Sequence, residues 1–392
     1  MITLETADSA LKSVYLGVIG NQLNIGANPL LTKIKQTTNN VYGNEIKKAT
    51  SVGISGGVSA GSENGELPGS YPTRRRQLVA TLKNLYGTIE ITDKAIRCSQ
   101  NSAGAFVNLL NDEMESLIKS STFNLGRMLY GDGTGIISTV TDTTEIDAEF
   151  IKVDKIRNFI ENMACRFVNP NKKSYAADES PINIEIVDRA NSQFSFDAFA
   201  QKDYKGYHIA TLNGLNNEIT GLGMIFNVSS NKLYGLDRHN NPWLNPHISE
   251  NVGEISELAI QTAIDKIEEE SQGVVDFIAC SAKVRRAYQE AMSTYRRNLD
   301  VMNLQGGFKA ISYNGVPVVT DRFVEDDAMY ILSTKDFELC QLCDWQWLEG
   351  NDGKIIKQKE GHPVYTATLV KYAELLCNRP SAQAKLTGIT GA

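Results

Sequence analysis

Residues 102–135 read SAGAFVNLLNDEMESLIKSSTFNLGRMLYGDGTG, and this stretch has the longest helical periodicity in the chain. A helix from Ser102 to Tyr130 is about 43 Å long at 1.5 Å per residue, which is enough to cross a whole domain. Only Ser121 interrupts its apolar stripe, and the glycines after Tyr130 end it. The apolar side chains recur at spacings that fit 3.6 residues per turn, and they are Phe106, Leu110, Met114, Leu117, Leu125 and Met128.

A segment rich in glycine and serine precedes the long helix. Residues 51–70, SVGISGGVSAGSENGELPGS, contain six Gly and five Ser, a composition with high backbone entropy and few side chains that can pack. Residues 71–92 after it, YPTRRRQLVATLKNLYGTIEIT, alternate as a β-strand does. Two interpretations fit equally well. One is a long β-hairpin whose tip is the Gly/Ser segment, and the other is a mobile linker between two domains.

The segments before the Gly/Ser stretch and after the long helix have less regular sequence patterns. Residues 1–45 are rich in Asn and only patchily apolar, so we expect an arm that packs on something else or a frayed terminus. Within 145–250 we predict a helix over Val153–Phe167 and no firm pattern beyond it. Residues 253–292 predict a helix, a short buried strand and a second helix capped by Ser281, and strands follow. This order predicts an α+β fold with a sheet covered by helices.

The composition is that of a globular protein. Of the 392 residues, 42% are hydrophobic and 22% are charged, which excludes wholesale disorder. The formal charge of −7, from 39 Lys and Arg against 46 Asp and Glu, argues against a chain whose main task is to grip nucleic acid by its phosphates. Six cysteines are too few for a disulfide scaffold, and the sequence has neither a secretory signal nor an apolar run of ~18 residues. We expect a soluble, cytosol-compatible protein.

Three motifs are similar to sites of chemistry, and each fits a structural role better. Gly53–Gly57 matches the nucleophile elbow G-x-S-x-G around Ser55, but no helix follows to hold the hydroxyl. The glycines of Gly131–Gly135 close a helix, whereas phosphate-binding glycines open one. Cys340 and Cys343 form a lone C-x-x-C on a strand, where they point to opposite faces. The four histidines match no ligand spacing, so we predict no catalytic residue, no cofactor and no metal site.

The order of these features resembles the major capsid proteins of tailed bacteriophages, which have the HK97 fold. Four ordered blocks carry the resemblance: the helix end at 123–135, then 274–292, 311–332 and 344–389. The resemblance, in the order of its features, covers essentially the whole chain. The resemblance implies an α+β, HK97-like capsid fold with an N-terminal arm, an extended β-hairpin loop, a peripheral domain with a long spine helix, and an axial domain.

The same resemblance implies the boundaries of these parts. They are the N-terminal arm at 1–45, the extended loop (E-loop) hairpin at 46–91, the peripheral domain with its spine helix at 92–142, the axial domain at 143–325, and the peripheral strands with the C-terminus at 326–392.

The hairpin supplies the residues that we expect to contact neighbouring subunits. Three arginines at its base are expected to meet carboxylates on a neighbour, because guanidinium groups pair well with carboxylates. An arm and a hairpin that bury little on their own chain would be stabilised by assembly. The candidates for inter-subunit contact are Arg74, Arg75, Arg76, Glu63, Glu66 and Tyr71.

The function that the resemblance implies is structural and not enzymatic. The chain would self-assemble into pentamers and hexamers of an icosahedral phage head, in the cytoplasm of a bacterial host. It would enclose double-stranded DNA without binding it specifically and would contact no membrane. Portal and decoration proteins are expected partners, and scaffolding is expected from a separate protein or a removed segment. The alternatives are an encapsulin-like nanocompartment shell and a cytosolic α+β hydrolase that uses Ser55 or the Cys340 and Cys343 pair.

Overall fold

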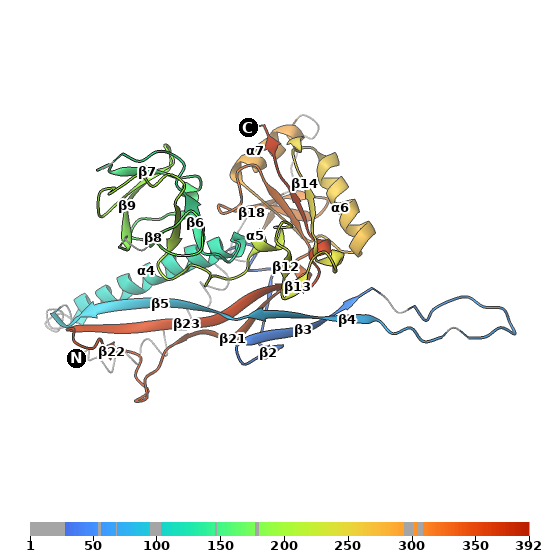
Figure 1. The fold of residues 1–392 in the computed structure, drawn as a ribbon, viewed down its shortest axis with the longest axis horizontal. Helices are drawn as coiled ribbons and strands as arrows, with labels where there is room; N and C mark the ends of the chain where they lie inside the picture. Colours follow the sequence, from blue (N-terminus) through green and yellow to red (C-terminus); the bar gives the residue numbers. More distant parts are fainter. Residues whose placement is uncertain are drawn as a thin grey trace.

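The structure is a computed structural model of the 392-residue chain. The residues that it describes are 28–53, 56–67, 69–94, 103–145, 147–176, 180–293, 301–303 and 309–391. The chain forms a long sheet with one long helix lying along it, two lobes above that sheet, and a hairpin that extends from one end (Figure 1).

The long helix and the long sheet form the base of the molecule. Helix α4 spans Ala103–Tyr130, as the periodicity predicts, and lies along the sheet (Figure 1). The sheet centres on β23 (Val364–Cys377), which is antiparallel to β5 (Lys83–Thr92) on one edge and to β21 (Phe337–Trp347) on the other. Two short strands complete it, β1 (Lys35–Thr37) beside β21 and β22 (Lys357–Gln358) beside β23.

Strand β5 alternates between buried and exposed residues along its length. Its buried residues face α4, and Gly87 is one of them. A Cβ at this glycine would lie 2.7 Å from a methyl carbon of Leu117 on the helix. Gly87 therefore permits the close approach of α4 to the strand.

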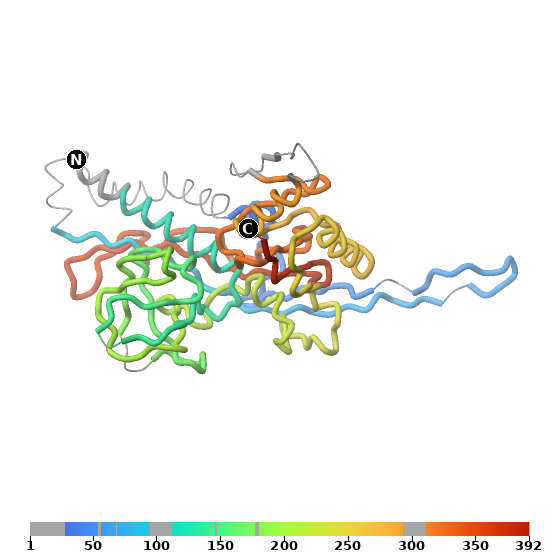
Figure 2. The backbone as a smooth tube through the Cα atoms, turned by 90° about the horizontal axis from the view of Figure 1, so that it is seen from above, coloured from blue at the N-terminus to red at the C-terminus, as the bar shows by residue number. Residues whose placement is uncertain are grey.

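Residues 45–81 form the hairpin and not a linker. Strand β3 (Glu45–Val52) pairs antiparallel with β4 (Arg74–Thr81) in unbroken register from Glu45↔Thr81 to Val52↔Arg74. Strand β2 (Val41–Tyr42) pairs with the root of β3. The hairpin extends well beyond the rest of the chain in both views (Figures 1 and 2).

The first lobe is a six-stranded antiparallel barrel, not the helix predicted over Val153–Phe167. Its sheet has the order β6-β11-β8-β9-β10-β7. Hydrogen bonds from Thr141 N to Lys152 O and from Asp154 N to Thr139 O join the two end strands and close the barrel. The strands are β6 (Ile136–Thr139), β7 (Phe150–Lys152), β8 (Ala164–Val168), β9 (Ile182–Asp188), β10 (Gln193–Phe196) and β11 (His208–Thr211), with a short 3-10 turn, η2, at Ile156–Asn158.

The apolar residues that suggested the helix fill the barrel instead. Phe159 and Met163 are buried in a cluster with residues of the other barrel strands, and Ile156 and Ile160 pack against that cluster. Asn162 has a positive φ of 62°, which a helix does not accommodate. The spacing of these apolar residues reflects a turn followed by a strand, so tertiary packing overrides the local pattern.

The second lobe is the predicted sheet covered by helices. Helix α6 (Glu257–Ser271) is capped by Ser256, and α7 (Ala282–Ser293) by Ser281, whose Oγ accepts a hydrogen bond from Val284 N. The seven strands, in sheet order, are β14 (His247–Ser249), β24 (Ala384–Leu386), β20 (Met329–Leu332), β16 (Phe277–Cys280), β19 (Val316–Thr320), β18 (Lys309–Tyr313) and β17 (Val301–Asn303).

The remaining elements that the structure describes are short. They are α5 (Leu222–Ile225), β12 (Lys232–Leu233), β13 (Leu236–Asp237), η3 (Pro242–Leu244), β15 (Gly253–Glu254), η5 (Thr334–Asp336), η6 (Pro380–Ala382) and β25 (Ile389–Thr390). No helix among the residues that the structure describes is long and apolar enough to span a membrane.

The packing units differ from the boundaries that the sequence suggested. The segment 143–325 holds two separate hydrophobic clusters, one in the barrel and one in the helix-covered sheet. The segment 326–392, expected in peripheral strands, also supplies β20 and β24 to the helix-covered sheet. The strands of this segment belong in part to the base sheet and in part to the helix-covered sheet. Strands that are distant in sequence therefore become neighbours, and no local sequence pattern indicates which sheet a strand joins. The names axial and peripheral refer to symmetry axes and stay predictions.

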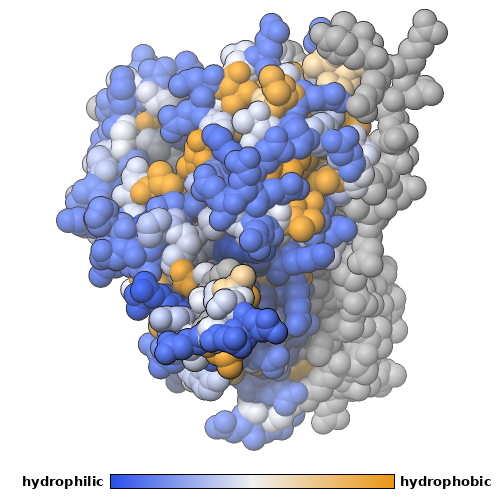
Figure 3. Space-filling view, turned by 90° about the vertical axis from the view of Figure 1, so that its right-hand side faces the viewer, coloured by the Kyte–Doolittle hydropathy of each residue, from blue (hydrophilic) through white to orange (hydrophobic). Residues whose placement is uncertain are grey.

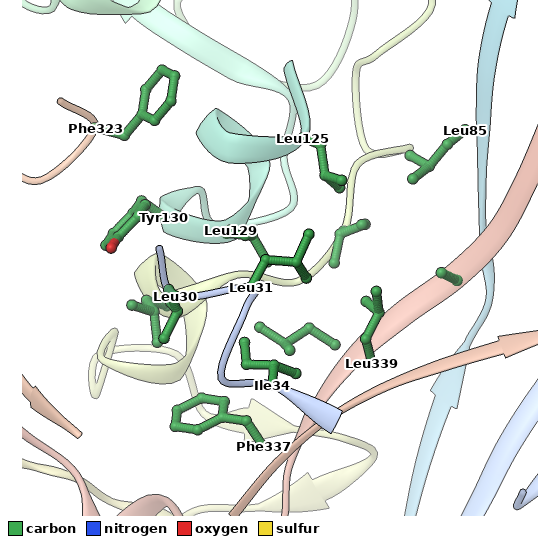
Figure 4. Packing of buried hydrophobic residues seen from close by; sticks show 14 of the residues in the cluster. Leu30, Leu31, Ile34, Leu85, Leu125, Leu129, Tyr130, Phe323, Phe337 and Leu339 are labelled. Carbon is green, nitrogen blue, oxygen red and sulfur yellow. The ribbon is translucent and has the colours of Figure 1, made fainter. Parts of the chain in front are cut away.

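The arm expected at 1–45 is also different in its described part. Leu30, Leu31 and Ile34 are buried in the main core of their own chain. Figure 4 shows them beside side chains of α4 and β21, such as Leu129 and Leu339. Residues 28–37 are therefore integral to the subunit fold, and the rest of the predicted arm, 1–27, lies outside the described residues.

Candidate assembly surfaces

The root of the hairpin is fixed rigidly to the subunit. Ile46 and Leu78 face the main core and are completely buried. Lys48 Nζ lies 2.7 Å from a carboxylate oxygen of Glu338 on β21, and Val79 N donates a hydrogen bond to Tyr234 O. These contacts fix the direction in which the hairpin projects from the subunit.

Beyond this root the hairpin packs against no core cluster formed by the residues that the structure describes. Apart from half-buried residues on β3 and at Gly57 and Thr73, its described residues are exposed, and Val58 and Leu67 are 89% and 91% exposed. An isolated two-stranded hairpin is at best marginally stable in water, and exposed apolar side chains favour burial. Figure 3 views the molecule from the side to which the hairpin points and shows a mainly hydrophilic surface with separate hydrophobic spots. The hairpin is thus a surface suited to association.

All six candidates for inter-subunit contact lie on this hairpin. Arg74, Arg75 and Arg76 are exposed on β4 and form no ion pair with any residue that the structure describes. Because side chains alternate along a strand, Arg75 points to the opposite face from the other two arginines. Nearer the tip, Glu63, Glu66 and Tyr71 are exposed. Their contact with a neighbouring subunit stays a prediction.

A buried polar contact holds the N-terminal end of the described chain. The Asn28 side-chain amide donates to the carboxylate of Asp321, and Asn28 Oδ1 accepts from Leu30 N at 2.8 Å. Burial raises the pKa of Asp321, and hydrogen bonds from Phe323 N and Asn28 oppose this effect. The contact fixes residues 28–34 against the core.

Sequence reasoning missed a buried ion pair where α4 of the base meets the barrel. Arg127 and Glu218 are both 4% exposed and form a bidentate pair, with nitrogen–oxygen distances of 2.9 and 2.6 Å. Thr211 Oγ1 of β11 also donates to Glu218. Because both charged groups are removed from water, their attraction offsets the cost of desolvation only while the two side chains keep this bidentate geometry.

Two further buried charges lie on β23. Lys371 is fully buried, and its Nζ lies 2.8 Å from Asp344 Oδ1 and 3.1 Å from Gln36 Oε1. Burial lowers the pKa of Lys371, and Asp344 opposes this. Glu374 accepts hydrogen bonds from Thr220 N and from its neighbour Leu375, and burial raises its pKa to about 7. A charged residue within the apolar run of 364–377 was the signal available in the sequence.

The raised pKa of Glu374 predicts that stability falls with pH. Below its unfolded pKa of 4.5 both states are protonated, and between 4.5 and about 7 the unfolded chain releases this proton while the folded chain keeps it. The free energy of unfolding should therefore fall by on the order of 3 kcal/mol as pH rises through this window. Urea titrations from pH 4.5 to 8 measure it, with Glu374→Gln as the comparison. An equal fall in that variant would assign the effect to other groups.

The motifs considered for chemistry occupy structural positions where the structure describes them. Cys340 and Cys343 lie on β21, and burial raises the pKa of Cys340 to about 11, so its reactive thiolate is scarce near neutral pH. Gly135 has φ +76°, and a Cβ there would overlap Gly214 O, so these glycines serve a tight turn. Ser55 lies outside the described residues. Among those described, no three His, Cys, Asp or Glu residues are grouped to hold a metal ion.

Comparison with known proteins identifies the fold. No family model and no curated protein sequence matches the chain. A chain of the cyanophage A-1(L) capsid is similar in structure, with a TM-score of 0.53 and 11% identity over 96% of this chain and 93% of that one. Weaker likenesses include the capsid of an empty GTA particle (TM-score 0.49, 9% identity, 93% and 90% covered) and the SrpI encapsulin of Synechococcus elongatus (0.46, 8%, 92% and 86%).

The likeness extends over nearly the full length of both chains, so it concerns the whole architecture and not one lobe. The chain has the fold of a phage capsid protein. In particular it is an α+β chain with the HK97-like fold, as the sequence resemblance implied.

Proposed function

We propose that the chain is the major capsid protein of a tailed-phage head, and that it assembles through repeated contacts between identical subunits. Pentamers and hexamers of it would close into an icosahedral shell around double-stranded DNA. The proposal assigns it no catalytic role. Its partners would be further copies of itself, a scaffolding protein, and portal and decoration proteins, with assembly in the cytoplasm of the bacterial host.

One observation carries this proposal. The chain has a capsid fold over nearly its full length, and its hairpin is anchored at the root by buried residues, whereas beyond Leu78 none of its described residues joins a core cluster. A long, exposed hairpin gains stability when a second subunit covers it. Identical subunits that each offer a hairpin and a receiving surface form head-to-tail contacts, which close into rings when the rotation allows.

The charge of the chain agrees with a container for DNA. The formal charge is −7, and a shell that gripped phosphates at every subunit would hinder packaging and release. We expect particles purified from host lysate to hold nuclease-protected double-stranded DNA. An encapsulin-like nanocompartment, the remaining shell alternative, would instead hold a cargo enzyme, so particles with protein cargo and no DNA would contradict the phage assignment.

The arginines of β4 should contribute to assembly and not to folding. In a chain with Arg74→Ser, Arg75→Ser and Arg76→Ser, we expect thermal unfolding of the free subunit to be nearly unchanged, because exposed substitutions alter stability by about 0.5 kcal/mol or less. The yield of particles should fall, and it should change less with salt concentration than the yield of the wild type does. Sedimentation at several salt concentrations measures both.

A matched control removes a positive charge elsewhere. Lys119→Ser takes an exposed lysine from α4, where its one ion pair with a residue that the structure describes is with Glu115 of the same helix. This variant should assemble as the wild type does. Equal yields from the triple-arginine variant and the wild type would remove these arginines from the interface.

A further inference from the structure

A polar cleft lies where the end of α4, the barrel and the second lobe meet. It has a volume of about 370 Å³. Its walls come from the last turn of α4, from β6, from the turn after β7, from the loop after β8, from the segment around α5, and from the loop between β19 and β20. Charged side chains from three parts of the chain therefore face one small space.

Two of the four carboxylates that line the cleft, Asp132 and Asp154, have structural roles in turns. Asp132 Oδ1 accepts hydrogen bonds from both the backbone N–H and the hydroxyl of Thr134. Asp154 Oδ1 accepts a hydrogen bond from Ser138 Oγ at 2.6 Å and another from Thr139 N at 2.7 Å. Aspartates that bond nearby backbone groups in this way are typical of turns.

The other two lining carboxylates are paired with cations of their own subunit. Glu218 forms the buried bidentate pair with Arg127. Glu325 Oε1 lies 2.9 Å from Lys385 Nζ, and this lysine lies outside the cleft lining. All four carboxylates thus have donors within the subunit.

Four cationic side chains line the same cleft and keep unused donors. Lys155 and Lys172 are exposed, and the ammonium group of neither has a hydrogen bond or an ion pair with any residue that the structure describes. Arg157 Nη1 lies 3.0 Å from Asp326 Oδ1. The Nε–H groups of Arg157 and Arg127 are buried and have no acceptor among the described residues. Cationic donors are therefore left over after the carboxylates have been bonded.

A ligand that suits these donors must bring acceptor oxygens and negative charge. Ammonium and guanidinium groups form strong, charge-assisted hydrogen bonds with phosphate. The donors approach from α4, from the turn after β7 and from the loop after β8, and three directions suit the tetrahedral oxygens of phosphate better than a planar carboxylate. Four cations balance four carboxylates in the lining, so the cleft suits one small group and not a nucleic-acid backbone, which needs an extended basic surface.

We propose that this cleft binds one phosphate group, either the free ion or a small phosphate ester, and that the bound group fixes the barrel to the end of α4. Lys155, Arg157 and Lys172 belong to the barrel, whereas Arg127 belongs to α4, so one ligand contacts both parts. The site lies within one subunit and adds a ligand to the proposed function without depending on assembly.

Calorimetric titration of the full-length chain before assembly tests the site at constant ionic strength. Inorganic phosphate and a nucleoside monophosphate are the two probes, because they distinguish the free ion from a phosphate ester as the source. We expect saturable binding of at least one of them. Lys155→Gln and Lys172→Gln should each weaken it by on the order of tenfold, because each removes a charge-assisted hydrogen bond.

The matched control is Lys173→Gln. Lys173 is an exposed lysine next to Lys172 in the chain, but it does not line the cleft, so this variant should bind phosphate as the wild type does. Equal weakening in this control would indicate general attraction to surface charge and would overturn the proposal. Failure of both probes to bind at millimolar concentration would overturn it too, as would acetate binding as tightly as phosphate.

Hydrogen exchange measures whether the ligand fixes the barrel. Residues 131–135 join α4 to β6, and residues 212–221 join β11 to α5, so these two segments connect the barrel to the base. Their amides should exchange more slowly when phosphate is bound, and Lys172→Gln should remove most of that protection. Unchanged exchange in phosphate that saturates the site would overturn the fixing of the barrel.

Discussion

Deletion of residues 56–68 should give a subunit that folds normally but no longer forms closed shells. The paired strands of the hairpin end at Val52 and Arg74, so the deletion removes the tip and leaves the root intact. None of the described residues in the tip belongs to a buried cluster. The free energy of unfolding should therefore change by no more than about 0.5 kcal/mol.

The loss of assembly in this deletion should be nearly complete, since every subunit loses the same contact. Circular dichroism melting of the free subunit and electron microscopy of assembly mixtures measure the two effects. Ser62→Ala, which alters the tip without shortening it, is the matched control and should assemble normally. An unfolded deletion variant would contradict the independence of tip and core, and closed shells from it would show that the hairpin is dispensable.

Arg127→Met should be the most destabilising single substitution that we predict. It leaves Glu218 buried without its partner, and breaking a buried ion pair in this way costs about 3–5 kcal/mol. The effect should be large because Arg127 lies on α4 of the base while Glu218 follows the barrel strand β11 and also accepts a hydrogen bond from Thr211, so the pair joins the base to the barrel. Urea unfolding of the free subunit measures it.

The double variant Arg127→Met with Glu218→Met separates this cause from a general packing defect. With both charges replaced by apolar side chains of similar length, no uncompensated charge is buried, and most of the lost stability should return. A double variant at least as unstable as Arg127→Met would show that shape at this junction, and not charge, determines stability.

Local patterns predicted those parts of the fold that local sequence controls. The helix at 103–130, the strand and two helices between 257 and 293, and the cap at Ser281 follow from periodicity and capping residues. For the hairpin, composition left a linker equally open, and only the pairing from Glu45 to Thr81 decides the matter. The sequence did not predict the barrel because its six strands are short. Each strand leaves only a few alternating apolar and polar residues, and nothing local indicates which strands pair.

The surfaces proposed for assembly and for binding likewise include some that the sequence indicates and some that only the fold reveals. The exposed arginines of β4 could be named from the sequence because a charged triplet at the base of a polar segment is visible there. The cleft at the end of α4 could not be named, since its walls come from α4, the barrel and the second lobe. Leu30 and Leu31 show the opposite error, because a weakly apolar segment was expected outside the core that it helps to form.

The most direct test of self-assembly is the particle size of the purified chain, alone and with candidate scaffolding proteins. Light scattering measures that size in solution, and electron microscopy of the same samples shows the symmetry. We expect hexamers and pentamers, and closed shells under assembly conditions. A strict monomer in every condition would contradict the account.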